Sequence, residues 1–250
     1  MPDDIIVIKN KFTDRWGKYF PGVELPLVFF YTDNRTIAEA TPKAEEWRCL
    51  IADLGRARRG FPLLFDIDSI GCGGGKRYLG FDSPAQPGFE HFLSCGIPGK
   101  IDGIRYKKTP ELVKAQMELQ KPFEAPAKYI VFKRWDKLEN SDKPLAVIFF
   151  AIPDVIAALF SLANFDEVDP NTVITPTGSG CSQIVYFPYQ ELLSGKNRAV
   201  LGMFDLSARP YVSADILTLA IPWPKFTGMI ENMDESFLIT DGWEKIKKRL

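Results

Sequence analysis

The sequence has few of the features that mark the common functional classes. Its 250 residues contain four cysteines and one histidine, and no two cysteines form a Cys-x-x-Cys pair. That spacing argues against thioredoxin-like motifs and the common zinc ribbons, and a chain of this length does not need disulfides to fold. A serine hydrolase would depend on the single histidine, His91, and the chain has no Gly-x-Ser-x-Gly segment for its nucleophile.

Charge and hydropathy argue against two further partners. The formal net charge is −1, and no basic block is interleaved with aromatics, so we expect neither nucleic acid nor a membrane surface as partner. The longest apolar run, 144–165, is divided at Pro153, and neither piece spans the ~30 Å hydrocarbon core of a bilayer. The start, Met1-Pro-Asp-Asp, lacks the apolar core of a secretory signal. We therefore expect a cytoplasmic protein with reduced thiols, and the oligomeric state stays open.

Strand-like and helix-like segments alternate along the chain. Strands are predicted at 25–31, 61–65, 129–132, 145–152, 172–175, 199–204 and 217–221, and the main helices at 9–19, 45–59, 109–121, 155–165 and 181–193. This alternation predicts one α/β domain, residues 1–250, with a mixed, mostly parallel sheet flanked by helices; α+β is the alternative. Regions 25–81 and 129–204 both run strand, helix, strand, Gly-Cys, helix, which indicates a weak internal duplication.

Two Gly-Cys pairs, Gly71-Cys72 and Gly180-Cys181, stand where a strand-like run gives way to a helix. In the first turn of a helix, unpaired N–H groups favour the thiolate over the thiol. Thiolates attack electrophiles and ligate soft metals, so both cysteines are candidates for catalysis or metal binding. The alternative for each is a turn or helix cap that contains a buried cysteine.

Cys49 is a third candidate. On the helix predicted at 45–59 it lies opposite the apolar stripe, where a cysteine is either an exposed thiol or faces a second surface such as a pocket. We predict that Cys49, Cys72 and Cys181 line one pocket. Cys95 shares a predicted helix face with His91, four residues earlier, but a packing role is favoured there.

The glycine-rich segment after Cys72 resembles an anion cradle. Its glycines let backbone N–H groups approach a ligand closely. Its two cations, Lys76 and Arg77, are expected in the first turn of a helix, where the helix dipole disfavours positive charge unless an anion or a thiolate lies nearby. It is not a P-loop, because Ile70 stands where the first glycine belongs. The candidate site for a small anionic ligand comprises Gly73, Gly74, Gly75, Lys76, Arg77 and Arg209.

Scattered short matches along nearly the whole chain resemble the ArCR family, a family of unknown function found in archaea and bacteria. They are Cys49-x-x-Ala52, Gly71-Cys72, Leu79-Gly80-Phe81, Val147–Phe150 before Pro153, Cys181, Leu201-Gly202, Arg209 and Ile221-Pro222. The resemblance implies a site at the cysteines and no established activity. Family members carry a further cysteine after the late Leu-Gly pair, where this chain has Met203. If the family holds a four-thiolate cluster, this chain lacks one ligand unless Cys95 or Met203 replaces it.

Two hypotheses from different classes follow. In the first, the thiols of Cys49, Cys72 and Cys181 bind a soft metal or an iron–sulfur centre, or act as redox or nucleophilic thiols. In the alternative, the segment Gly73–Arg77 captures a carboxylate or phosphate in a non-catalytic binding module. The residues alone do not decide between an enzyme and a binding protein.

Overall fold

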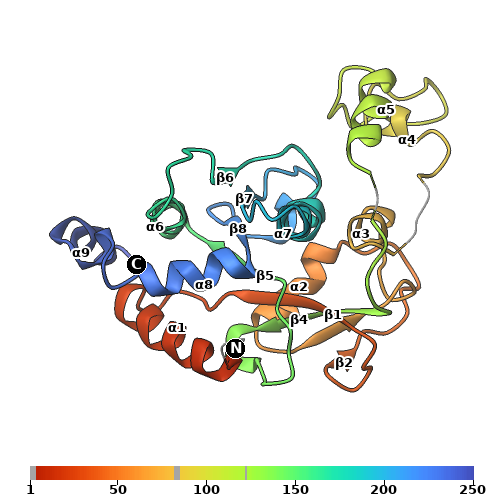
Figure 1. Cartoon of the computed structure of the whole chain (residues 1–250). Coiled ribbons are helices and arrows are strands. Elements are labelled where there is room, and N and C mark those ends of the chain that lie inside the picture. The colour runs from red at the N-terminus through yellow and green to blue at the C-terminus, as the bar shows by residue number, and fades with distance from the viewer. Residues whose placement is uncertain (1–3, 82–84, 122) are drawn as a thin grey trace.

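One mixed sheet organises the chain (Figure 1). The computed structural model describes residues 4–81, 85–121 and 123–250, and within these residues eight strands pair in the order β2-β3-β4-β1-β5-β8-β7-β6. The strands are β1 (Leu27–Thr32), β2 (Glu39–Ala40), β3 (Leu63–Phe65), β4 (Tyr129–Arg134), β5 (Ala146–Ala151), β6 (Val173–Ile174), β7 (Ala199–Gly202) and β8 (Leu217–Pro222).

The predicted mixed sheet flanked by helices is confirmed, but the predicted excess of parallel pairing is wrong. Five of the seven described pairings are antiparallel, and only β2–β3 and β6–β7 are parallel. A parallel pair needs a crossover connection between neighbouring strands. Helical crossovers join parallel neighbours only at these two edges. Of the other connections, β3–β4 and β7–β8 join strands that pair antiparallel, and the rest join strands that are not neighbours in the sheet. Alternation of strands and helices along the chain therefore overstated the parallel content.

The strand order has a symmetry that the sequence pattern did not reveal. Each half of the sheet has a parallel strand–helix–strand unit at its edge and two antiparallel strands toward the centre, and β1 pairs with β5 where the halves meet. The order matches β3 with β7, and β4 with β8. This correspondence relates 27–134 to 146–222, rather than 25–81 to 129–204. The single domain and the duplication stay predictions.

The central strands are buried on both faces, because each face carries its own helices and hydrophobic cluster. Val147 and Phe149 of β5 belong to one cluster, and Ile148 and Phe150 belong to the other. The first cluster is covered by α1 (Ile5–Tyr19), α6 (Pro153–Ala163), α8 (Trp223–Asn232) and α9 (Asp241–Lys247). The second is covered by α2 (Leu50–Arg58) and the helix at 180–193. The cysteine candidates other than Cys95 lie on this second face.

The 180–193 helix is continuous but not uniform. It begins with two α-helical residues, 180–181, continues as the π-helical segment η2 (Ser182–Tyr186), and ends as α7 (Phe187–Leu193). A π-turn inside an α-helix widens the backbone locally and is found frequently at functional sites.

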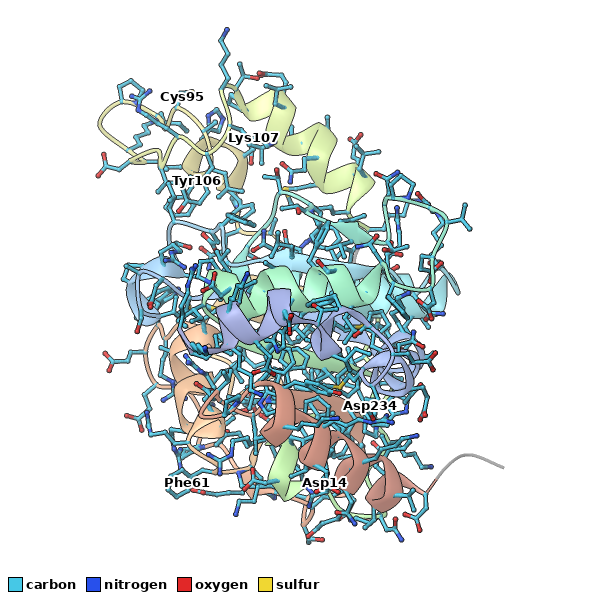
Figure 2. The ribbon with its side chains drawn as sticks, turned by 90° about the vertical axis from the view of Figure 1, so that its left-hand side faces the viewer. Asp14, Phe61, Cys95, Tyr106, Lys107 and Asp234 are labelled. Atoms are coloured by element: carbon cyan, nitrogen blue, oxygen red, sulfur yellow. The ribbon has the colours of Figure 1, made fainter. Side chains whose placement is uncertain are left out.

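Residues 85–121 form an excursion between the short helix α3 (Gly73–Tyr78) and β4. It contains α4 (Phe89–Phe92) and α5 (Pro110–Leu119), which project from the body in Figure 1, with Cys95, Tyr106 and Lys107 at the far end in Figure 2. Helix α5 begins as predicted, with the Thr109 hydroxyl accepting the Leu112 N–H at 3.4 Å.

Two further expectations were that no segment spans a membrane and that the N-terminus is not a secretory signal. Among the described residues no helix combines the length and the apolar character needed to cross a bilayer. Residues 1–3, on which the argument about a secretory signal depends, lie outside the described residues.

Candidate functional site

Cys49 caps a helix instead of lying on its polar face. Helix α2 begins at Leu50, not at Glu45, and Cys49 is its N-cap residue in extended conformation. A helix over 45–59 would place Trp47 on its apolar stripe, but that side chain is 65 % exposed and lies before the helix, so the register assumed for Cys49 was wrong. The Cys49 carbonyl accepts the N–H of Ala52 at 3.0 Å, which closes the first turn.

Cys72 is the N-cap of α3 and uses its sulfur as the capping acceptor. Its Sγ accepts the backbone N–H of Gly75 at 3.2 Å. The Cys72 side chain is half-buried. A thiolate would accept this hydrogen bond from the helix start more strongly than a neutral thiol does. The predicted helix start at the first Gly-Cys pair is therefore confirmed, with the cysteine itself in the capping position.

Cys181 lies in the first turn of the 180–193 helix and is buried. Ser179 caps this helix, because its hydroxyl accepts the N–H of Ser182 at 3.2 Å. The same hydroxyl lies 3.2 Å from the Cys181 sulfur. Asp205, from the loop after β7, accepts the Gly180 N–H at 2.8 Å, so a carboxylate also compensates the positive end of this helix.

Glycines bring these three helix starts close together. A Cβ on Gly71 would lie 2.7 Å from the backbone nitrogen of Arg48, directly before Cys49. A Cβ on Gly180 would lie 3.1 Å from the Ile51 side chain, in the first turn of α2. Because only glycine permits these approaches, the segments of Cys72 and Cys181 both pack against the start of α2.

Burial favours the neutral thiol at Cys49 and Cys181, and the charge of neighbouring groups adds to that effect. Burial raises the pKa of Cys181 far above its ordinary value, and a negative charge on Cys72 raises it further. Burial also raises the pKa of Cys49, the N–H groups of Ile51 and Ala52 lower it, and the charge of Cys72 raises it. Burial, with a contribution from Cys181, raises the pKa of the neighbouring Tyr78 to about 12.

The site is not an assembled metal centre. No group of three or more histidine, cysteine, aspartate or glutamate side chains among the described residues is arranged to hold a metal ion. Cys95 is exposed on the excursion, and within the described part of the chain its sulfur forms hydrogen bonds with its neighbours Ser94 and Gly96 and with none of the other three cysteines. The Nδ1 atom of His91 is buried without a hydrogen-bond partner among the described residues, and no contact of His91 with Cys95 is found there.

The cations of the expected anion cradle have other surroundings. Helix α3 is only six residues long, so Lys76 and Arg77 lie in its last turn, where the dipole favours cations. The premise that an anion must offset them is therefore wrong. Arg77 donates to the Gln120 carbonyl at 3.4 Å, and Arg209 donates to the carbonyls of Ser213, Ala214 and Ile216.

Three residues near the thiols were not singled out from the sequence for the roles that they have. The amide oxygen of Gln183, in the π-helical segment, accepts the N–H groups of Met203 at 2.8 Å and Phe204 at 3.3 Å. Met203 is fully buried and has φ = 72°, in the left-handed region that non-glycine residues seldom adopt. Asp205 follows directly. A sequence signal for this segment was available. Gly202-Met203, like Gly71-Cys72, is a glycine followed by a sulfur-containing residue near the end of a strand-like run.

The family model described as Uncharacterised ArCR (DUF169) matches residues 25–232, which is most of the chain. The chain therefore belongs to this family, and the resemblance carried by the cysteine motifs is confirmed. No curated protein and no solved structure matches the chain.

Proposed function

We propose that this member of the ArCR family binds a soft metal ion through the thiolates of Cys49, Cys72 and Cys181. The observation that carries the proposal is that each of the three sulfurs belongs to a residue at the start of a different helix, with those starts packed together. Soft thiolate ligands favour ions such as copper(I) and zinc(II) and iron–sulfur centres.

Helix starts support thiolates in a way that other positions do not. A helix start carries a partial positive charge, worth roughly 0.3–1 kcal/mol to a nearby anion. At the start of the 180–193 helix, Asp205 and Ser179 already accept the N–H groups of Gly180 and Ser182. Gly75 already donates to the Cys72 sulfur, and Ile51 and Ala52 lower the pKa of Cys49. Three thiolates would otherwise repel one another, so this compensation is what a three-sulfur site needs.

Binding must displace protons and draw the sulfurs inward. Cys49 and Cys181 have raised pKa values, so both are thiols at neutral pH, and each releases a proton when it ligates a metal. Metal–sulfur bonds are near ~2.3 Å, and the metal-free arrangement does not hold such a group. The short α3, which is only six residues long, is the element that we expect to move.

Titration of anaerobically purified protein tests the proposal. We expect one equivalent of copper(I), zinc(II) or cobalt(II) to bind, with sulfur-to-metal charge-transfer absorption for cobalt(II) and with proton release. Serine at Cys49, Cys72 or Cys181 should weaken binding by at least about tenfold, because loss of even an outer-shell partner costs that much.

Cys95→Ser is the matched control, because it removes an exposed thiol that lies on the excursion. It should leave the affinity and the absorption unchanged. If Cys95→Ser weakens binding as much as the other three substitutions, or if the wild-type protein binds no soft metal under reducing conditions, the proposal fails. Rapid disulfide formation among the three cysteines without metal binding would instead favour a redox-thiol role.

A further inference from the structure

We propose that a polar hollow at one edge of the sheet binds a small zwitterion of the α-amino acid class. The hollow has a volume of about 310 Å³ and is lined by side chains of two segments, 167–172 and 196–198, and by Lys225 of α8. At ~30 Å³ for each water molecule of the liquid, this is room for about ten water molecules or for one amino acid. None of the lining residues carries a thiol, so the inference does not rest on the proposed function.

Strand pairing holds the two segments side by side. They directly precede β6 and β7, which are parallel, so both segments lie at the same end of this pair. The Ala199 N–H donates to the Thr172 carbonyl at 2.8 Å and joins the segments where β7 begins. Thr172 is buried, and its hydroxyl donates to the Asn164 side chain at the end of α6. The sheet and α6 therefore fix the backbone that frames the hollow.

Two of the cations around the hollow are already paired. The Lys225 side chain is only 9 % exposed, and its ammonium contacts Glu167 at 2.6 Å and Asp166 at 3.3 Å. Arg198 donates two hydrogen bonds to the carboxylate of Glu191, at 2.7 and 2.9 Å. These pairs neutralise their own charges and position the remaining N–H donors of both cations. They leave the net charge of the hollow to its other ions.

The other two ions have opposite signs. In the part of the chain that the structure describes, neither Lys196 nor Asp169 belongs to an ion pair, although both line the hollow. The Asp169 carboxylate accepts the backbone N–H of Asn171 at 2.8 Å and its side-chain amide at 3.1 Å. These hydrogen bonds, together with the charge of Arg198, lower the pKa of Asp169, so it is ionised at neutral pH. The hollow therefore offers one ammonium and one carboxylate to a ligand.

An amino acid matches both ions at once, because its carboxylate pairs with Lys196 and its ammonium pairs with Asp169 in charge-assisted hydrogen bonds. A simple anion would meet Lys196 but also the carboxylates of Glu167 and Asp169. Asn197 gives further support. Its Nδ2 donates to the Gly195 carbonyl at 3.1 Å, which fixes the orientation of the amide, and its Oδ1 is buried with no donor among the described residues. A ligand ammonium is a donor of the kind that this oxygen lacks.

Titration of the ¹⁵N-labelled full chain with each of the standard L-α-amino acids, followed by nuclear magnetic resonance, tests the proposal on the wild-type protein. We expect at least one of them to bind, with amide shifts concentrated in 167–172 and 196–198. The N-acetyl derivative of that amino acid lacks the ammonium, and its amide derivative lacks the carboxylate. Each derivative should bind at least about tenfold more weakly, because each leaves one charged group of the hollow without its partner.

Substitutions assign the two charges. Lys196→Gln and Asp169→Asn change exposed side chains, so the variants should fold, and each should weaken binding of the amino acid by at least about tenfold. Lys108→Gln and Asp102→Asn are the matched controls on the excursion, where both side chains are also exposed, and should leave the affinity unchanged.

Three results would overturn the proposal. The first is that no amino acid shifts the amides of the two segments. The second is that the control substitutions weaken binding as much as those in the hollow. The third is that acetate or inorganic phosphate binds as tightly as the amino acid, which would show a site for simple anions. None of these results bears on the thiols of the proposed function.

Discussion

Raising the pH should destabilise the protein through Cys181, because the folded state holds this thiol neutral. In the unfolded chain the thiol ionises near its ordinary pKa of 9.0, whereas burial raises the pKa of the folded state far above that value. Above pH 9 the unfolded state therefore binds fewer protons than the folded state. Stability is fully present below pH 9 and falls as the pH rises.

The magnitude follows from one proton. Each pH unit above 9 costs about 1.4 kcal/mol per such group, so Cys181 alone should remove about 2 kcal/mol of unfolding free energy between pH 8 and pH 10.5. That is a measurable share of a typical total of about 5–15 kcal/mol. Tyr31 and Tyr78, whose pKa values are also raised by burial, contribute a parallel decline from about pH 10.

The assay is urea unfolding under reducing conditions at intervals from pH 8 to pH 10.5, for wild type and Cys181→Ala. The variant loses some stability at every pH, but its decline should be shallower than that of wild type by about 2 kcal/mol over this range, since burial, the main cause of the raised tyrosine pKa values, remains in both. Cys95→Ala, which removes an exposed thiol, should decline in parallel with wild type. Equal declines for wild type and Cys181→Ala would refute the burial argument.

Two substitutions test the packing around the site and the sheet. Gly71→Ala should lower the free energy of unfolding by about 1–3 kcal/mol, because the added Cβ meets the Arg48 backbone. Gly74→Ala is the control and should be neutral or stabilising, because Gly74 has open space around it. A similar cost for both variants in denaturant unfolding would contradict the close approach at Gly71. Asp142→Asn should cost about 3 kcal/mol, because it weakens the pairing of the buried Lys133 ammonium. Adding Lys133→Met to Asp142→Asn should recover part of that loss. If the stability changes of the two single variants simply added up in the double variant, the two side chains would not be energetically coupled.

The sequence predicted most elements where local signals are strong. Thr109 before Pro110 marked the start of α5, and Pro153 marked the start of α6, because a cap or a proline acts within one helical turn. The error at Cys49 has a physical reason too. Residues 45–49 continue the helical period of α2 in sequence, but they are not helical, and Cys49 is extended next to Arg48, which packs against Gly71.

For the site, the sequence identified the three cysteines but not their surroundings. Asp205, Gln183 and the strained Met203 are brought to Cys181 by the pairing of β7 with β8 and by the loop that follows β7. Such contacts join residues about 20 positions apart, and no local pattern encodes them. The position predicted for Lys76 and Arg77 in the first turn of a helix was wrong for the converse reason, because the length of α3, which places both residues in its last turn, depends on packing.

The sequence by itself determined the inventory of this protein: four cysteines, a single histidine, two Gly-Cys pairs at helix starts, and strands and helices in alternation. These are consequences of residue type and of short-range backbone preferences. Only the tertiary structure decided that most strands pair antiparallel and that three helix starts meet on one face of the sheet. Strand order and close approach depend on which distant segments bury one another, and the free energy of that burial is a property of the whole fold.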